Sequence, residues 1–103
     1  NEKFDLFSPF YVSISVRINL LRVNKLKFAN ELKEENVPLL ASYGCVISEW
    51  NWAKKFLNDK FITKNALDYK NKSFNLFLNE NYSQREANFI FKKILKIEEK
   101  YLK

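Results

Sequence analysis

Hydrophobic and polar positions alternate along one stretch near the start of the chain. From Phe10 to Ile18 every second residue is apolar, and Tyr, Ser or Arg stands between them. A period of two places successive side chains on opposite faces of a strand. The segment is therefore predicted to be a half-buried β-strand, and Pro9 marks its entry because proline is tolerated at a strand's first residue.

The pattern then changes to helical spacing. Asn24 is a favoured N-cap residue, and the predicted helix runs from it to about Glu35. Its apolar positions are Leu26, Phe28, Ala29 and Leu32. Asn36 is predicted to end the helix in the left-handed conformation, where Asn substitutes for Gly. Residues 37–42 form a short apolar segment, and Pro38 near its start predicts an edge strand.

Two short helices are predicted in the middle of the chain, after a loop at residues 43–45. Ser48 would cap the first helix, which extends to about Leu57, and the second covers residues 65–69. Trp50 and Trp52 stand two positions apart and cannot share a helical face. We expect one of them in the core and the other on a partner surface.

The last third of the chain predicts a strand followed by a long helix. Residues 73–80 alternate, with Phe74, Leu76 and Leu78 on one face. Ser83 and Glu86 form a capping box at the start of the helix. Its apolar side is predicted to hold Ala87, Ile90, Phe91, Ile94, Leu95 and Tyr101. Its outer face is predicted to be basic and solvated, with Lys92, Lys93, Lys96 and Lys100.

This order of elements predicts an α+β fold. The sheet is small, antiparallel or mixed, with about three strands, helices packed on one side and a long C-terminal helix. The chain has 103 residues, which suits one domain, residues 1–103. Hydrophobic residues make up 47% of it and aromatic residues 17%, which is too apolar for a disordered tail.

Composition excludes several kinds of active site. The chain has no His and a single Cys, Cys45, so a zinc site built from Cys and His and a Ser-His nucleophile are both ruled out. A single Gly excludes a glycine-rich phosphate loop. We therefore assign no catalytic, cofactor-binding or metal-binding residue to this chain. No apolar run is long enough to cross a bilayer and no signal peptide is recognisable, so a cytoplasmic protein is expected.

The net charge of +6 allows binding to nucleic acid, an anionic surface or a phosphorylated ligand. The basic residues are spread over the whole chain, and the sequence contains no aromatic RNA-binding motif, GXXG loop or recognition helix. A small independent module that binds RNA or another polyanion stays open as an alternative. The chain has no Met and starts on a charged stretch, which favours a segment of a longer protein.

Candidate binding residues lie in two loops. Asn79 and Asn81 stand where the last predicted strand breaks into the last helix, and loops on a rigid scaffold often hold binding groups. Tyr43 stands beside the only Gly. The alternatives are a turn that uses the backbone tolerance of Asn, and a buried, hydrogen-bonded Tyr.

Five segments in order resemble the C-terminal domain of the DegT/StrS-type aminotransferases. Residues 10–16 are similar to the strand that leads into the family's small domain. Residues 23–38 resemble its helix and Gly-Ile-Pro-like turn, with Asn36 in place of Gly. Residues 41–43 correspond to a stretch that often ends in a His-Tyr pair, and the His is missing here. Residues 49–52 and 65–83 look like the branch with a Ser-Phe-Asn-Leu strand and a Glu-Asn loop.

The resemblance implies the C-terminal small domain of a pyridoxal-phosphate-dependent aminotransferase that aminates keto-sugars, often nucleotide-linked. A large N-terminal domain would carry the Schiff-base Lys and the phosphate contacts, so this chain alone would be inactive and hold no pyridoxal phosphate. The parent would be a homodimer, and the small domain would close its substrate cleft with Tyr43, Asn79 and Asn81 on the substrate. A membrane or nucleic-acid partner is not expected. An assembly domain, suggested by the two Trp residues and the apolar last helix, is a third possibility.

Overall fold

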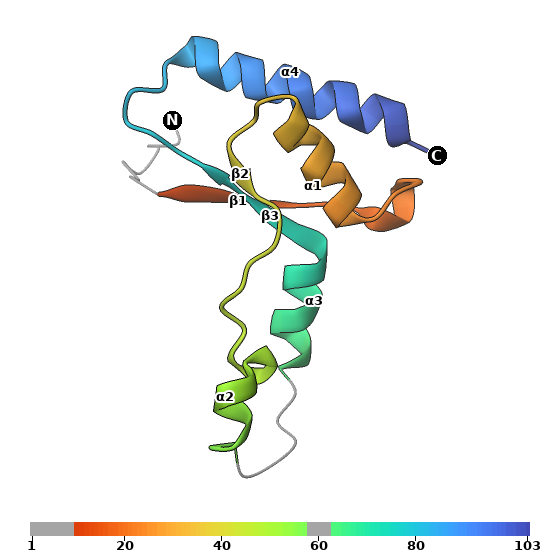
Figure 1. Ribbon diagram of the computed structural model, residues 1–103. Helices are drawn as coiled ribbons and strands as arrows, with labels where there is room; N and C mark the ends of the chain where they lie inside the picture. The colour runs from red at the N-terminus through yellow and green to blue at the C-terminus, as the bar shows by residue number, and fades with distance from the viewer. Residues whose placement is uncertain (1–9, 58–62) are drawn as a thin grey trace, which may run out of the picture.

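The computed structural model describes residues 10–57 and 63–103, and within them it has three strands and four α-helices (Figure 1). The strands are β1 Tyr11–Ser15, β2 Leu39–Leu40 and β3 Ser73–Phe77. The α-helices are α1 Lys25–Glu34, α2 Asn51–Lys54, α3 Lys64–Lys72 and α4 Gln84–Tyr101. Two single-turn 3-10 helices are η1 Ile18–Leu20 and η2 Ile47–Glu49. The predicted α+β class and long C-terminal helix are confirmed.

β3 is the central strand of an antiparallel sheet with the order β1-β3-β2. Its register pairs Ser13 with Asn75 and Leu39 with Leu76. Because side chains alternate along a strand, the sheet has two different faces. The covered face carries Val12, Ile14, Leu39, Phe74 and Leu76. The open face carries Tyr11, Ser13, Ser15, Leu40, Ser73, Asn75 and Phe77.

The hydrophobic core lies between the covered face of the sheet and two helices, α1 and α4. Leu32 of α1 and Phe74 of β3 are fully buried, and the Phe28 ring lies 6.2 Å from the Phe74 ring. Ile90 and Ile97 are the buried residues of α4. They stand seven positions apart and so point in nearly the same direction from the helix. Figure 1 shows both helices above the sheet, as the one-sided packing predicted from the sequence requires.

Both ends of α1 agree with the prediction. The Asn24 side chain accepts a hydrogen bond from the Lys27 amide at 2.9 Å. Asn36 has a φ of 65°, the left-handed conformation expected of it. The placement of Leu26 on the apolar face is wrong, because its side chain is exposed. The buried residues of this helix are Lys25, Phe28, Ala29 and Leu32, and their spacing leaves position 26 to solvent.

The strands are shorter than the alternating pattern predicts. β1 ends at Ser15, and Ile18 already belongs to η1. Phe10 is exposed before the strand begins, and Leu78 is exposed after β3 ends at Phe77. β2 has only two residues, although it is the edge strand that Pro38 predicts. Pairing with a neighbour limits a strand's length, and alternation alone does not reveal how long that neighbour is.

α4 begins at the predicted capping box. The Ser83 amide donates to the Glu86 carboxylate at 2.8 Å, and the Arg85 amide donates to the Ser83 hydroxyl at 3.2 Å. The predicted apolar side is partly wrong, because Phe91 and Leu95 are exposed whereas Ile97 is buried. The helix is rotated so that the line through Ile90, Ile94, Ile97 and Tyr101 faces the core.

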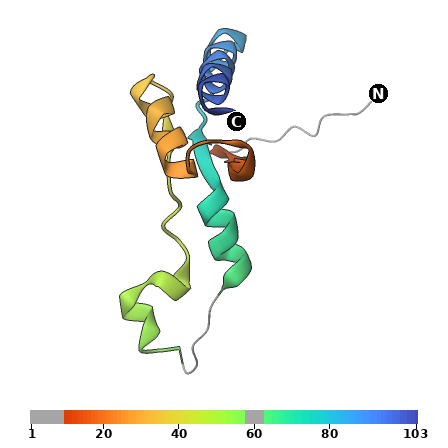
Figure 2. The same ribbon diagram turned by 90° about the vertical axis from the view of Figure 1, so that its right-hand side faces the viewer.

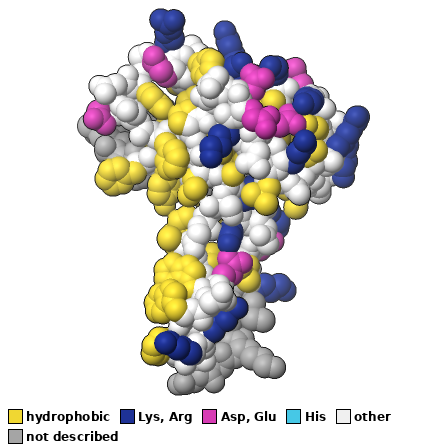
Figure 3. Space-filling view, viewed as in Figure 1, with side chains coloured by type: hydrophobic (Ala, Val, Ile, Leu, Met, Phe, Trp, Pro, Cys, Tyr) yellow, Lys and Arg dark blue, Asp and Glu magenta, His cyan; other side chains and the backbone are white. Residues whose placement is uncertain are grey.

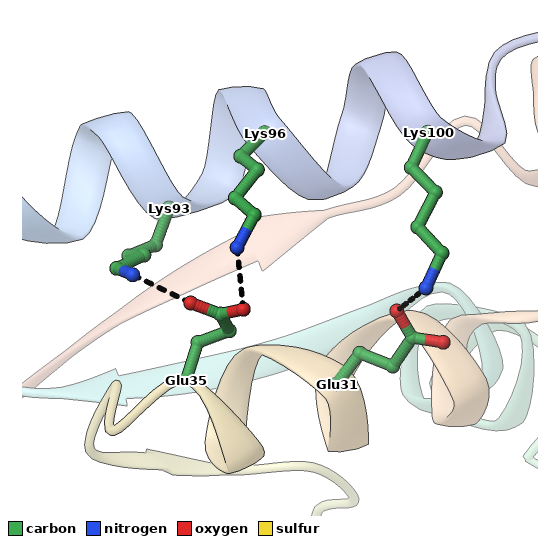
Figure 4. A network of polar contacts seen from close by, with 5 residues as sticks. All are labelled: Glu31, Glu35, Lys93, Lys96 and Lys100. Atoms are coloured by element: carbon green, nitrogen blue, oxygen red, sulfur yellow. Dashed lines mark hydrogen bonds and ion pairs between the residues drawn. The ribbon is translucent and has the colours of Figure 1, made fainter.

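The rotation of α4 brings three of its lysines to α1 (Figure 4). Lys93 and Lys96 contact the two oxygens of the Glu35 carboxylate at 2.5 and 2.6 Å, and Lys100 contacts Glu31 at 2.8 Å. Lys92, Lys96 and Lys100 are exposed as predicted, whereas Lys93 is half-buried beside Glu35. Hydrogen bonds from Lys93 and then Lys96 lower the pKa of Glu35 to about 2.

A projecting arm, formed by residues 41–57 and 63–72, leaves the sheet after β2 and returns to β3 (Figures 1 and 2). The remaining described residues, 10–40 and 73–103, are called the head. Ser48 does not cap α2 as predicted. Its hydroxyl instead contacts the Thr63 hydroxyl at 2.7 Å, and α2 begins after Trp50. The second predicted short helix is confirmed as part of the longer α3.

Replacement of Glu35 by Gln should make the stability of the fold less dependent on pH below about 4.5. The pKa of Glu35 is about 2 in the folded chain and 4.5 when unperturbed, so its stabilisation is complete above pH 4.5 and is lost as the pH falls toward 2. Thermal unfolding followed by circular dichroism should therefore show a smaller loss of Tm between pH 4.5 and 2 for Glu35→Gln than for the wild type. Glu34→Gln changes an exposed neighbouring residue and should show the same loss of Tm between pH 4.5 and 2 as the wild type.

Substitution of Asn36 tests the left-handed end of α1. A Cβ atom is disfavoured in this conformation, and Asn is tolerated there better than Ala. Asn36→Ala should lower the free energy of unfolding by about 1 kcal/mol. Asn36→Gly should retain or slightly raise it, because Gly has no Cβ. Urea unfolding at neutral pH measures both, and equal values for the two variants would contradict the assigned backbone conformation.

Candidate functional site

A cavity of about 240 Å³ lies where the arm meets the open face of the sheet. Its polar lining comes from the sheet and from both sides of the arm: Tyr11, Ser13, Tyr43, Cys45, Tyr69, Lys70 and Asn75. Larger hollows occur elsewhere, including one of about 430 Å³ between the end of α1 and the start of α4. We favour the smaller one because hydroxyl, amide and ammonium groups converge there from distant parts of the sequence.

Asn75 lies at the floor of this cavity, at the centre of the sheet. It stands opposite Ser13 of β1 and Leu40 of β2, and only 7% of it is exposed. Burial of an amide side chain without hydrogen-bond partners costs free energy, so polar neighbours are expected around Asn75. Ser13 and Tyr69 supply hydroxyl groups on the same lining.

A pair of hydrogen bonds fixes α3 against the sheet. The Tyr69 hydroxyl donates to Ser13 Oγ at 2.6 Å, and the Ser73 hydroxyl donates to the Tyr69 carbonyl at 2.7 Å. α3 leads directly into β3, so these contacts set the angle at which the arm leaves the head. They also hold the Tyr69 ring at the edge of the cavity.

Two lysines lie close to the cavity, one of them buried in the head. Lys25 is only 4% exposed, and its amine donates to the Ala41 carbonyl at 2.6 Å. Burial, together with the nearby charge of Lys70, lowers the pKa of Lys25. Lys70 itself forms an ion pair with Glu49. Sequence reasoning missed Lys25 because a lysine in the first turn of a helix is normally solvated.

Tyr43, the first residue predicted to bind substrate, lines this cavity. Hydrogen bonding to the adjacent Cys45 thiol raises the pKa of the Tyr43 phenol. The hydroxyl is therefore protonated at neutral pH and can both donate and accept a hydrogen bond. The structure thus brings Tyr43 together with Tyr11, Ser13 and Asn75.

Asn79 and Asn81, the other predicted site residues, lie in the exposed turn between β3 and α4. Asn79 Oδ1 accepts from the Asn81 amide at 2.8 Å, and the Asn79 carbonyl accepts from the Tyr82 amide at 2.9 Å. These bonds are typical of a turn built around Asn. Neither residue lines the Tyr43 cavity, so their role in binding stays a prediction.

Asn75 is the lining residue that the sequence could have revealed. It interrupts the apolar residues of a predicted strand. The alternation of side chains already places it on the other face of the strand from Phe74 and Leu76. The partners that make it part of a site, Tyr43 and Tyr69, come from two sides of the arm. Their proximity depends on how the arm folds back, which local patterns do not determine.

The lining of this cavity does not fit pyridoxal phosphate. Its one amine, that of Lys70, is paired with Glu49, and the lining holds no carboxylate that could pair with a pyridine nitrogen. Within residues 10–57 and 63–103, no cluster of three or more acidic or cysteine side chains could hold a metal ion. Across these same ranges, no helix is both long and apolar enough to span a bilayer.

The chain matches no protein-family model, and searches of curated proteins and of solved structures gave no match either. Function must therefore be inferred from the residues and their geometry. A fold class alone would not be sufficient, because one fold supports many activities.

A double-mutant cycle tests the contact that orients the arm. Tyr69→Phe and Ser13→Ala each remove one partner of the same hydrogen bond, and each should lower the free energy of unfolding by about 0.5 to 1 kcal/mol. The double variant should be little worse than either single variant, with a coupling energy of about 0.5 to 1 kcal/mol. Urea unfolding measures all four proteins. Strictly additive losses would show that the two hydroxyls do not interact.

Proposed function

We propose that this chain is the closing domain of a pyridoxal-phosphate-dependent aminotransferase that acts on keto-sugars, in particular nucleotide-linked ones. The observation that carries the proposal is the one-sided sheet. Two helices cover one face, and the open face with the arm forms a polar and aromatic cavity. Such a surface becomes a complete cleft when a second domain lies against it.

The chemistry of the lining suits a sugar. Tyr43 and Tyr69 present aromatic rings with hydroxyl groups, and Ser13 and Asn75 add neutral donors and acceptors. Neutral groups of this kind can hydrogen-bond to several hydroxyls of one sugar, while the rings pack on its apolar edges. The buried Asn75 amide offers the most rigidly placed of these contacts.

Positive charge around the cavity suits the phosphates of a nucleotide-linked substrate. The described arm contains five lysines and two acidic residues, so it keeps an excess of positive charge although Lys70, which lines the cavity, is paired with Glu49. An anionic sugar nucleotide is attracted to such a surface more strongly than a neutral sugar is.

The resemblance to the DegT/StrS-type aminotransferases supports the same assignment. In this proposal pyridoxal phosphate, held by the larger domain of the parent homodimer, supplies the electron sink for amino transfer. The residues of this chain bind and orient the sugar. They also exclude water from the closed cleft.

The complete gene product tests the proposal. Purified from its natural coding sequence, it should contain bound pyridoxal phosphate, detected by visible absorption, and should aminate a nucleotide-linked keto-sugar with an amino-acid donor. The 103-residue chain purified alone should show neither property, because its cavity does not fit the cofactor. A complete product that neither binds pyridoxal phosphate nor aminates such sugars would refute the assignment.

Variants of the cavity identify the residues that contact the sugar. Asn75→Ala and Tyr43→Phe should each lower kcat/KM about tenfold, which corresponds to the loss of one substrate hydrogen bond, with cofactor content unchanged. Asn79→Ala should also lower kcat/KM if Asn79 contacts substrate as the resemblance implies. Unchanged kinetics would show that Asn79 is not part of the site. Asn88→Ala, at an exposed amide of α4, is the matched control.

A further inference from the structure

The arm carries a ladder of three aromatic side chains. The rings of Trp50 and Trp52 stack at 5.5 Å, and Phe56 meets Trp52 edge-on at 6.5 Å. Trp50 Nε1 donates to the Gly44 carbonyl at 2.8 Å, which fixes the first ring. The two Trp side chains meet because Trp50 precedes the helix and is not helical itself. The prediction that they lie on separate faces, with one of them in the core, is wrong, because neither belongs to the core. Trp52 is 62% exposed and Phe56 is 68% exposed.

The ladder continues as an apolar strip along the arm. The strip consists of Leu40 at the end of β2 and four exposed residues of the arm: Tyr43, Ile47, Trp52 and Phe56. Figure 3 shows hydrophobic side chains gathered along one edge of the arm and on the adjacent part of the head. A rigid apolar surface of this kind is typical of a protein interface, and Trp and Tyr are enriched at its energetic centre.

The shape of the molecule leaves the strip without cover from its own head. The radius of gyration is 16.5 Å, whereas a compact chain of this length has about 13 Å. Figures 1 and 2 show the arm directed away from the sheet in both views. These side chains are therefore accessible to a partner surface.

Charge argues against a second copy of this chain as that surface. The described arm carries five lysines against two acids, and the head carries eleven basic against seven acidic residues. Docking of an arm on a second arm or head would bring like charges together. The complementary surface is therefore acidic at its rim.

The arrangement of the rings favours a protein surface over a nucleic acid. Base stacking needs free ring faces, and one face each of Trp50 and Trp52 is occupied by the other ring. The Lys55 amine lies 5.0 Å from the centre of the Phe56 ring. Two lysines of the arm are neutralised nearby, Lys70 by Glu49 and Lys72 by Asp68. Leu40 and Ile47 add aliphatic area, which suits a packed protein interface.

We propose that the apolar strip docks on an apolar protein surface rimmed by carboxylates. This identification of the partner rests on the proposed function, in which the surface belongs to the cofactor-binding domain of the same enzyme. Docking holds the closing domain in place through Trp52 and Phe56. Ser13, Tyr69 and Asn75 of the cavity lie outside the strip and remain available to substrate.

Cys45 gives a direct readout of docking. It is the only cysteine of the chain, it is exposed, and it lies in sequence between Tyr43 and Ile47 of the strip. Alkylation by iodoacetamide, followed on the Cys45 peptide by mass spectrometry, should be at least about tenfold slower in the complete gene product than in the 103-residue chain. Tenfold protection corresponds to about 1.4 kcal/mol of docking free energy.

Paired variants separate docking from general damage. In the complete protein, Trp52→Ala combined with Phe56→Ala should restore rapid alkylation. Phe91→Ala, at an exposed aromatic residue of α4 outside the strip, should leave Cys45 protected. The content of bound pyridoxal phosphate in the complete protein is measured separately. If Cys45 is protected but no cofactor is bound, the docking proposal stands and only the proposed function is refuted.

Three results would overturn the docking proposal. The first is equally rapid alkylation of Cys45 in the complete product and in the 103-residue chain. The second is protection of the 103-residue chain by a single-stranded oligonucleotide alone, which would make the strip a nucleic-acid surface. The third is protection that grows with the concentration of the 103-residue chain alone, which would make the strip a contact between copies.

Discussion

β3 is the strand on which the rest of the structure depends, because its alternate side chains serve two surfaces at once. Phe74 and Leu76 anchor α1 and α4 on one face, and Asn75 between them forms the floor of the cavity on the other. Both other strands pair with β3 alone. A shift of one residue in its register would expose the core residues and bury the polar ones. The core and the candidate site are therefore fixed by the same hydrogen-bonded ladder.

The contact between α1 and α4 adds specificity to this packing. Apolar residues of both helices fill the core, and ion pairs from Lys93, Lys96 and Lys100 reach the carboxylates of Glu31 and Glu35 at its edge. Partly exposed ion pairs contribute little stability individually. They form in the same rotation of α4 that buries Ile97 and leaves Phe91 in solvent. The apolar contacts and the ion pairs are therefore consistent with one orientation of this helix.

The arm serves a different purpose from the head. Its two sides meet the open face through Tyr43 and Tyr69, so the cavity exists only because the chain leaves the sheet after β2 and returns through α3. Its exposed aromatic ladder gives it a surface of its own, apart from the cavity. Substrate binding and domain docking are thus assigned to two neighbouring groups of residues, which share Tyr43.

Local sequence patterns were sufficient to predict the Asn24 cap, the left-handed Asn36 and the capping box at Ser83 and Glu86, because each depends on residues within a few positions of one another. The order of the predicted elements along the chain was sufficient for the α+β class. Long-range packing determines the lengths of the strands, the side of α4 that is buried, the burial of Lys25 and the grouping of Tyr43 with Asn75 instead of Asn79. Those features arise from contacts between segments 16 or more residues apart, whose free energy is not visible in any local pattern.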